Sequence, residues 1–253
     1  MHMKREGRRY PPMLTYAETW VFAAAFLFLL LFAFCELQIH AAPRHDPKSA
    51  LFRVFLLVLI SAVFYTGGLL RYQRSGNTRV LKTLMGLFFL FYLYLLVNMT
   101  LLDGGLGREY IVESITRNER EEYLRLFVNL RPFRSIYEVY IRGFIKGYVN
   151  TYYTLVNLMG NLLVLAPFAF FLPLGWKAQK KWFVFLPTIL ALAIAVEALQ
   201  FAFMVGSCDV DDLILNVSDT MLVYLVLKCK PVASLLTRFV GDEPPFPRSQ
   251  KTI

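Results

Sequence analysis

Carboxylate and amide side chains recur at spacings of three and four residues within the apolar C-terminal half of the sequence. Residues with these spacings share one face of a helix. Three sets have this pattern: Asn157 and Asn161, Glu197 and Gln200, and Asp212, Asn216 and Asp219. Such groups are costly in hydrocarbon, by about 2.5–3.5 kcal/mol for a central Asp, so each requires a partner, a water-filled cavity or a function.

Glu197 is the residue of this set best suited to proton transfer. Burial favours the protonated form of a carboxyl group, which then serves as general acid or base near neutral pH. Asp209 and Asp212 are its nearest candidate partners, so these three are the candidate catalytic residues. A serine–histidine triad is not expected, because all three histidines lie outside the last three predicted helices, and the sequence has no phosphate-binding glycine loop or zinc motif.

Three aspartates form an acidic run just before the last apolar segment, at Asp209, Asp211 and Asp212. Their carboxylates either bind a divalent cation through oxygen ligands or cap the start of a helix, where the dipole favours negative charge. Both interpretations stay open at this point. Apart from this possible cation, the sequence predicts no cofactor.

The composition predicts a membrane protein. Hydrophobic residues make up 57% of the 253 residues, and the mean hydropathy of +0.49 is too apolar for a soluble chain. About six windows approach the roughly 20 apolar residues that a spanning helix needs: 19–39, 51–70, 80–102, 154–172, 182–204 and 212–228. Backbone groups in hydrocarbon must bond within the chain, so the predicted fold class is all-α, a transmembrane helical bundle. The first two windows are nearly free of intramembrane charge and are expected to form an accessory hairpin.

The distribution of charge predicts the topology. The net charge of +9 comes from Lys and Arg at the ends of the predicted helices, with no aromatic-interleaved basic patch, so nucleic acid is not an expected partner. Alternate connections are basic, which places both termini in the cytoplasm and puts connections 40–50, 103–153 and 205–211 outside.

This topology predicts two tiers of polar groups. Asn161, Glu197 and Asp219 each lie about seven residues, or roughly 10 Å, below the outer end of their helix. A second tier lies nearer the outer mouth and consists of Asn157, Gln200 and Asn216. Glu197 and Asp219 at one depth would repel when ionised, so one would hold a proton or both would share a cation or cationic ligand.

The long outer connection changes character along its length. Residues 108–125 have mixed charges at helical spacing and predict a solvated helix. Residues 127–146 mix apolar and basic side chains, which is typical either of a segment lying on the outer leaflet or of a small extracellular cap. Arg131 and Arg134 match the geometry of a phosphate or lipid headgroup, although interfacial arginines also snorkel without binding a ligand.

Four short motifs occur in a fixed order. They are Asn129-Leu130-Arg131-Pro132-Phe133; Asn157-Leu158-Met159-Gly160-Asn161-Leu162-Leu163 with Pro167 and Leu172-Pro173-Leu174; Glu197-Ala198-Leu199-Gln200; and Cys208-Asp209-Val210-Asp211-Asp212-Leu213-Ile214-Leu215-Asn216. Over residues 84–228 the chain resembles the VanZ-like family, which is named for a teicoplanin-resistance protein. The resemblance implies a multi-pass protein of the bacterial plasma membrane and, from the founding member, lowered susceptibility to lipoglycopeptide antibiotics. It implies no established reaction.

The chain departs from the family pattern at two positions. The family often has an Arg shortly before the acidic run, where this chain has Gly206. The family usually has a small residue after the Asn that corresponds to Asn216, where this chain has Asp219. The role of Asp219 therefore rests on the depth argument alone.

The sequence thus predicts a cytoplasmic segment and hairpin over residues 1–79, a VanZ-like domain over 80–228 and a cytoplasmic tail over 229–253. The favoured function is a cell-envelope protein that recognises or modifies an outer-leaflet amphiphile, such as a lipid-linked wall precursor or a lipoglycopeptide. A membrane scaffold and an ion-coupled transporter are the alternatives. Membrane lipids are expected partners, and the oligomeric state stays open. The candidate ligand-binding residues are Asn129, Arg131, Arg134, Asn157, Asn161, Gln200, Asp211, Asn216 and Asp219.

Overall fold

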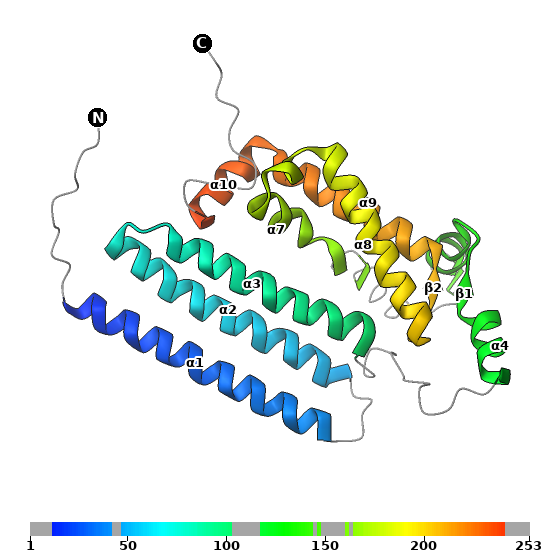
Figure 1. Ribbon diagram of the computed structural model, residues 1–253, viewed down its shortest axis with the longest axis horizontal. Helices are drawn as coiled ribbons and strands as arrows, with labels where there is room; N and C mark the ends of the chain where they lie inside the picture. Colours follow the sequence, from blue (N-terminus) through cyan, green and yellow to red (C-terminus); the bar gives the residue numbers. More distant parts are fainter. Residues whose placement is uncertain are drawn as a thin grey trace, which may run out of the picture. The chain divides into compact units, whose positions relative to one another are not determined.

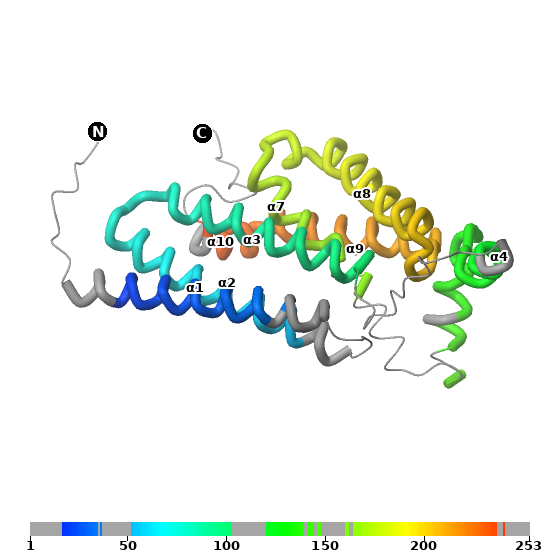
Figure 2. The backbone as a smooth tube through the Cα atoms, turned by 60° about the horizontal axis from the view of Figure 1, so that its bottom comes forward, coloured from blue at the N-terminus to red at the C-terminus, as the bar shows by residue number. Residues whose placement is uncertain are grey.

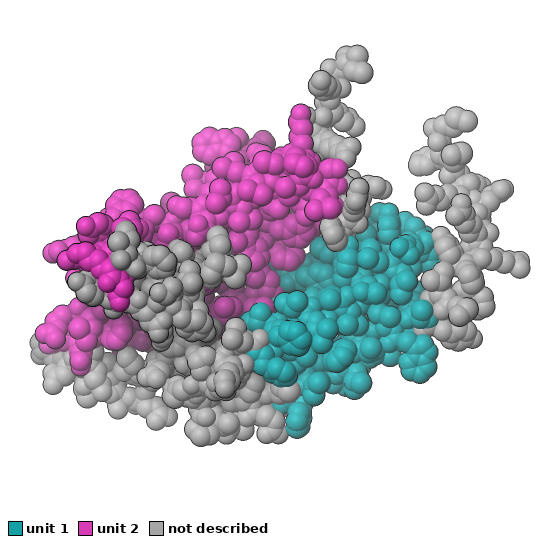
Figure 3. All heavy atoms as spheres, turned by 180° about the vertical axis from the view of Figure 1, so that it is seen from behind, with its two compact units in different colours: residues 1–91 teal, residues 92–253 magenta. Residues whose placement is uncertain are grey.

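The protein is described by a computed structural model. It covers residues 12–41, 47–102, 117–143, 146–147, 160–161 and 164–240. Across these residues the chain is almost entirely helical, as the composition predicts. It divides into two compact units, residues 1–91 and 92–253, which Figure 3 colours separately.

Unit 1 contains a long hairpin followed by most of a third helix (Figures 1 and 2). Its helices are α1 (Pro12–Ala41), α2 (Pro47–Ser75) and the first part of α3 (Arg79–Val97). Two adjacent glycines let α2 lie close to both neighbours. A Cβ atom on Gly67 would lie 3.2 Å from the ring of Phe22 in α1, and one on Gly68 would lie 2.0 Å from Leu84 in α3.

The hairpin carries ion pairs near both of its ends. Near one end the buried Glu18 pairs with Arg71 at 3.4 Å and Arg74 at 3.3 Å, and near the other Glu36 pairs with the buried Arg53 at 3.7 Å. The two glutamates are eighteen residues apart, or about 27 Å, which is close to the thickness of a hydrocarbon core. The charges of the hairpin are thus paired near the two borders of its apolar stretch, and the stretch between them carries little charge.

Unit 2 begins within α3 and contains the remaining elements. They are η1 (Asn98–Leu102), α4 (Arg117–Leu126), β1 (Val128–Asn129), η3 (Ile136–Gly143), α7 (Phe168–Gly175), η4 (Lys177–Lys180), α8 (Trp182–Phe203), β2 (Cys208–Asp209), α9 (Val210–Lys228) and α10 (Lys230–Val240). The solvated helix predicted for 108–125 is present as α4 over its described part.

Aromatic side chains hold the helices of unit 2 together. Phe185 of α8 stacks on Tyr224 of α9 with ring centroids 4.2 Å apart, and the Tyr224 hydroxyl donates to the carbonyl of Lys180 at 2.6 Å. At the end of α3, Tyr92 contacts Phe168 and Phe171 of α7 and donates to the carbonyl of Val164 at 2.7 Å. The contact of Phe185 with Tyr224 packs the first part of α8 against the last part of α9, and the contacts of Tyr92 join α3 to α7.

Four helices among the described residues are long and apolar enough to cross a membrane. They are Ala17–Phe34, Phe52–Ser75, Arg79–Leu102 and Trp182–Phe203. Helix α9 has a similar length but carries Asp211, Asp212 and Asp219. Residues 154–159 and 162–163 of the window 154–172 lie outside the described residues. The helical, membrane-protein character is confirmed, whereas a total of about six spans and cytoplasmic termini remain predictions.

Each single substitution of the pair Glu36 and Arg53 should destabilise the hairpin. Glu36→Gln or Arg53→Gln leaves a buried charge without this counter-charge, and the free energy of unfolding should fall by about 2–3 kcal/mol. The double variant should recover part of that loss. Unfolding of the full chain in detergent, measured for all four members of the cycle and for exposed Arg120→Gln as control, checks this. Strictly additive single losses would show that the pair does not interact.

Candidate functional site

The chain reverses direction between α8 and α9 through two residues with positive φ. Met204 ends α8 at φ 50°, and Gly206 follows at φ 70°. Glycine adopts this region without the steric cost that a Cβ atom imposes, so Gly206 fits the turn. The reversal returns the chain alongside α8, where the backbone N–H of Asp209 donates to Glu197 at 3.2 Å.

A short parallel pairing joins two motifs that are about 80 residues apart in sequence. Strand β1 pairs with β2, so that Val128 faces Cys208 and Asn129 faces Asp209. The N–H of Cys208 donates to the carbonyl of Phe127 at 2.9 Å. The Asn-Leu-Arg-Pro-Phe motif is thereby placed directly against the acidic run (Figure 1).

Asp209 is both a helix cap and a cross-link. It is the N-cap of α9, and its Oδ1 accepts from the N–H of Asp211 at 2.9 Å and from Nδ2 of Asn129 at 2.9 Å. Its Oδ2 accepts from the hydroxyl of Ser135. The side-chain Oδ1 of Asn129 accepts from the N–H of Arg131 at 3.1 Å and turns the chain there. The capping interpretation of the acidic run therefore holds for this residue.

Asp211 is fully buried and accepts three backbone hydrogen bonds. Its donors are the N–H groups of Phe133 at 2.5 Å, Ser135 at 2.6 Å and Ile136 at 3.1 Å. It lies in the first turn of α9 and at the start of η3, where unpaired N–H groups stabilise an anion. We call residues 129–136, which Asp209 and Asp211 hold in this way, the clamped loop.

The clamp leaves little room for a cation at the acidic run. The oxygen atoms of Asp209 and Asp211 that would ligate an ion already accept N–H and O–H donors. Over the part of the chain that the structure describes, no group of three His, Cys, Asp or Glu side chains could hold a metal ion. Asp209 and Asp211 thus act as hydrogen-bond acceptors that hold the loop in place.

Glu197 lies buried beside Cys208. The carboxylate accepts from the Asp209 N–H, and the Cys208 thiol hydrogen-bonds to it. Burial raises the pKa of the Cys208 thiol, and the charges of Glu197, Asp209 and Asp212 raise it further. Cys208 is absent from the candidates drawn from the sequence; its position immediately before Asp209 in the acidic motif is the signal that points to it.

Two further candidates make interhelical bonds. Nδ2 of Asn161 donates to Asp212 at 2.7 Å, which ties the segment before α7 to the first turn of α9. Nε2 of the buried Gln200 donates to the carbonyl of Thr100 at 3.0 Å and ties α8 to η1. Asn157 lies outside the described residues.

The predicted depth tiers need correction. Glu197 contacts the backbone immediately before α9, and Asn161 contacts the first turn of α9. Asp219 lies ten residues beyond Asp209, or about 15 Å further along the helix, and is half-buried. Asn216 is buried one turn beyond Asp212, and its Oδ1 has no hydrogen-bond partner within the described residues. Glu197 and Asp219 therefore do not share a level, and their predicted repulsion does not arise.

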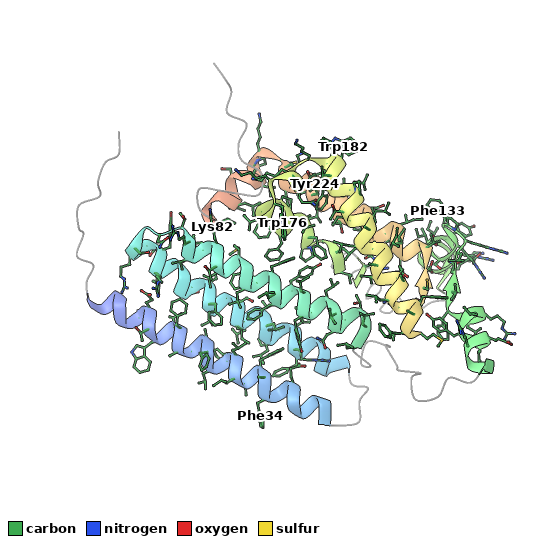
Figure 4. All side chains as sticks on the ribbon, viewed as in Figure 1. Phe34, Lys82, Phe133, Trp176, Trp182 and Tyr224 are labelled. Atoms are coloured by element: carbon green, nitrogen blue, oxygen red, sulfur yellow. The ribbon has the colours of Figure 1, made fainter. Side chains whose placement is uncertain are left out.

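The outer side of the clamped loop is exposed. Leu130 is 73% and Phe133 62% exposed, and Arg131 and Arg134 flank them with exposed guanidinium groups. Phe133 has a φ of 64°, unusual for a residue with a side chain, and the bonds to Asp211 hold it there. Figure 4 shows Phe133 at one end of unit 2, far from Trp182, the first residue of α8.

These features define a helical membrane protein in which buried carboxylates at the start of one helix hold an exposed apolar and cationic loop. The family model described as VanZ/LLP1 matches residues 88–232, more than half of the chain, and the chain belongs to this family. The predicted family membership is thus confirmed. No curated protein and no solved structure matches the chain. The matched region includes every candidate site residue and leaves out α1 and α2.

Asp211→Asn should loosen the clamped loop. The amide has one acceptor instead of two charged oxygens and turns an NH₂ group toward backbone N–H donors, a loss of about 2 kcal/mol or more. Hydrogen exchange of the amides of Phe133, Ser135 and Ile136 should therefore accelerate by about 30-fold. Asp219→Asn, which lies far from the loop, is the matched control. Unchanged exchange in the Asp211 variant would refute the clamp.

Cys208 should react slowly with iodoacetamide, because only the thiolate attacks and its pKa is raised. In a chain carrying Cys35→Ala and Cys229→Ala, the inflection of the rate against pH should lie above the ordinary thiol range. Glu197→Gln removes one nearby negative charge and should move the inflection to lower pH, while Glu138→Gln should not. A higher plateau with an unmoved inflection would indicate greater access instead of a changed pKa.

Proposed function

We propose that this protein lies in the bacterial plasma membrane and binds, at its outer surface, an amphiphile with an anionic headgroup. By doing so it lowers susceptibility to lipoglycopeptides such as teicoplanin. The observation that carries the proposal is the clamped loop, which presents the apolar Leu130 and Phe133 and the cationic Arg131 and Arg134 together to solvent. A rigid loop with apolar and cationic side chains together matches a ligand that has both an acyl chain and a phosphate.

The chemistry of the exposed side chains supports each half of such a ligand. A guanidinium group forms paired, charge-assisted hydrogen bonds with phosphate or carboxylate. Removing a large apolar side chain from water gains about 1.5–3 kcal/mol, so Leu130 and Phe133 favour an acyl chain or the bilayer surface itself. The clamp holds this loop before the ligand arrives, which lowers the entropy lost on binding.

Binding without a reaction fits the carboxylates better than catalysis. Of the three catalytic candidates, Asp209 is committed to the cap and to the loop, and Asp212 bonds to Asn161. Glu197 accepts from the N–H of Asp209 and lies buried. These bonds account for the carboxylates as structural groups, so we propose recognition and not modification of the amphiphile.

The proposed orientation follows from the length of α8. Its 22 residues extend about 33 Å, enough to cross the hydrocarbon core, and they separate the clamped loop from lysines at the other end. The positive-inside rule then places the lysines in the cytoplasm and the loop outside. With residues 154–172 and 212–228 as further spans, about six helices and cytoplasmic termini complete the proposed arrangement.

A double substitution of the exposed arginines tests the proposal without disturbing the clamp. Expressed at matched membrane levels in a susceptible host, wild type should raise the teicoplanin concentration that inhibits growth, and Arg131→Gln with Arg134→Gln should abolish the increase. Arg120→Gln with Arg125→Gln, which removes two exposed arginines of α4, should keep it. A related glycopeptide without an acyl chain should show a smaller effect of the wild-type protein.

The other outcomes are equally informative. Full protection by both double variants would refute headgroup recognition by the loop and favour a scaffold that acts through another envelope protein. No protection by wild type would refute the antibiotic part of the proposal. Leu130→Ser, measured in parallel, should weaken protection if the loop binds the acyl chain.

A further inference from the structure

The end of unit 2 at which α8 begins is strongly basic. Five lysines lie there on two connections, between α7 and α8 and between α9 and α10, and we call them the basic rim: Lys177, Lys180, Lys181, Lys228 and Lys230. Neither residues 164–196 nor residues 220–240 contain an Asp or Glu. The charged residues of these two segments are therefore all cationic.

Contacts between the two connections keep the lysines together. The hydroxyl of Tyr224 in α9 donates to the carbonyl of Lys180 at 2.6 Å. The same ring stacks on Phe185 and lies 5.2 Å below Nζ of Lys228. Lys180 is half-buried, and the other four lysines of the rim are exposed. Like charges are thus held close to one another by the packing of α8 on α9.

The aromatic residues around the rim are those of a membrane interface. Trp176 and Trp182 are 55% and 56% exposed on either side of η4, and Figure 4 shows both near Tyr224. Tryptophan prefers the headgroup level of a bilayer. The N-cap of α8 is Lys181, whose side chain makes no capping hydrogen bond, so the positive end of this helix dipole faces the same level. All of these features favour an anionic partner.

We propose that the basic rim binds the phosphate headgroups of anionic phospholipids in the adjoining leaflet. Exposed lysines, interfacial tryptophans and an uncapped helix start converge where the apolar part of α8 meets the headgroups. Lipid phosphate carries the negative charge that is complementary to the exposed lysines. This site lies at the opposite end of α8 from the clamped loop and does not depend on the amphiphile proposed there.

The test compares lipid preference in the purified full chain. Nanodiscs or mixed micelles with phosphatidylglycerol or phosphatidylcholine are the probes, and the lipid retained by the protein is measured by mass spectrometry. The wild type should retain phosphatidylglycerol preferentially. In the triple variant Lys177→Gln, Lys181→Gln and Lys228→Gln, the preference should fall by about tenfold or more, since each lysine near an anionic surface contributes roughly fivefold.

Three controls make the result decisive. Replacing Arg120, Arg125 and Lys146 by Gln removes the same charge from exposed positions elsewhere in unit 2 and should leave the preference intact. The three lysines replaced by Arg should also keep it, which separates loss of charge from loss of folding. The wild-type preference should weaken as NaCl is raised.

Three outcomes would overturn the inference. The first is a wild type that retains both lipids equally, and the second is a triple Gln variant that keeps the full preference. The third is displacement of phosphatidylglycerol by inorganic phosphate at an equal concentration, which would assign the rim to a free anion and not to a lipid surface.

Discussion

A buried carboxylate is the constraint on which the site depends. Asp211 has no exposed surface, and a charge in that position is stable only if donors replace the water it has lost. The donors are three N–H groups of residues 133–136. Because these amides belong to a segment more than 70 residues earlier, satisfying one side chain fixes a long-range contact. The pairing of β1 with β2 and the hydrogen bonds of Asp209 to Asn129 and Ser135 join the same two segments of the chain.

The clamp changes the meaning of the acidic run. In the sequence alone, three aspartates suggest acid–base chemistry or a bound cation. In the structure, the carboxylate oxygens of Asp209 and Asp211 accept hydrogen bonds from backbone and side-chain donors. Their negative charge also lies at the start of α9, where the dipole stabilises it. The residues left exposed are those that the clamp presents, Leu130, Arg131, Phe133 and Arg134. The proposed function therefore depends on the side chains of the clamped loop, and the carboxylates hold that loop in place.

Much of this arrangement follows from sequence, and the failures have physical causes. Helix-length apolar windows and the co-occurrence of the four motifs predict the helices and the family. The depth tiers place each residue by its distance from the end of its own helix, and they fail for Asp219. The turn at Met204 and Gly206 carries Asp209, and not Asp219, back beside Glu197. No periodicity reveals that reversal. The hairpin pairs were missed because Glu36 and Arg53 are adjacent only after the chain folds back.

The bonds of the clamp continue into the membrane-spanning helix. Asp209 bonds through its N–H to Glu197 on α8, and one turn away Gln200 of α8 bonds to the carbonyl of Thr100 in η1. Each of these groups is buried, so a shift of the clamped loop would leave a polar atom unpaired unless α8 and η1 moved with it. The loop is thus mechanically part of the bundle. Arg131 and Arg134 therefore lie on a surface that hydrogen bonds connect to α8 and η1.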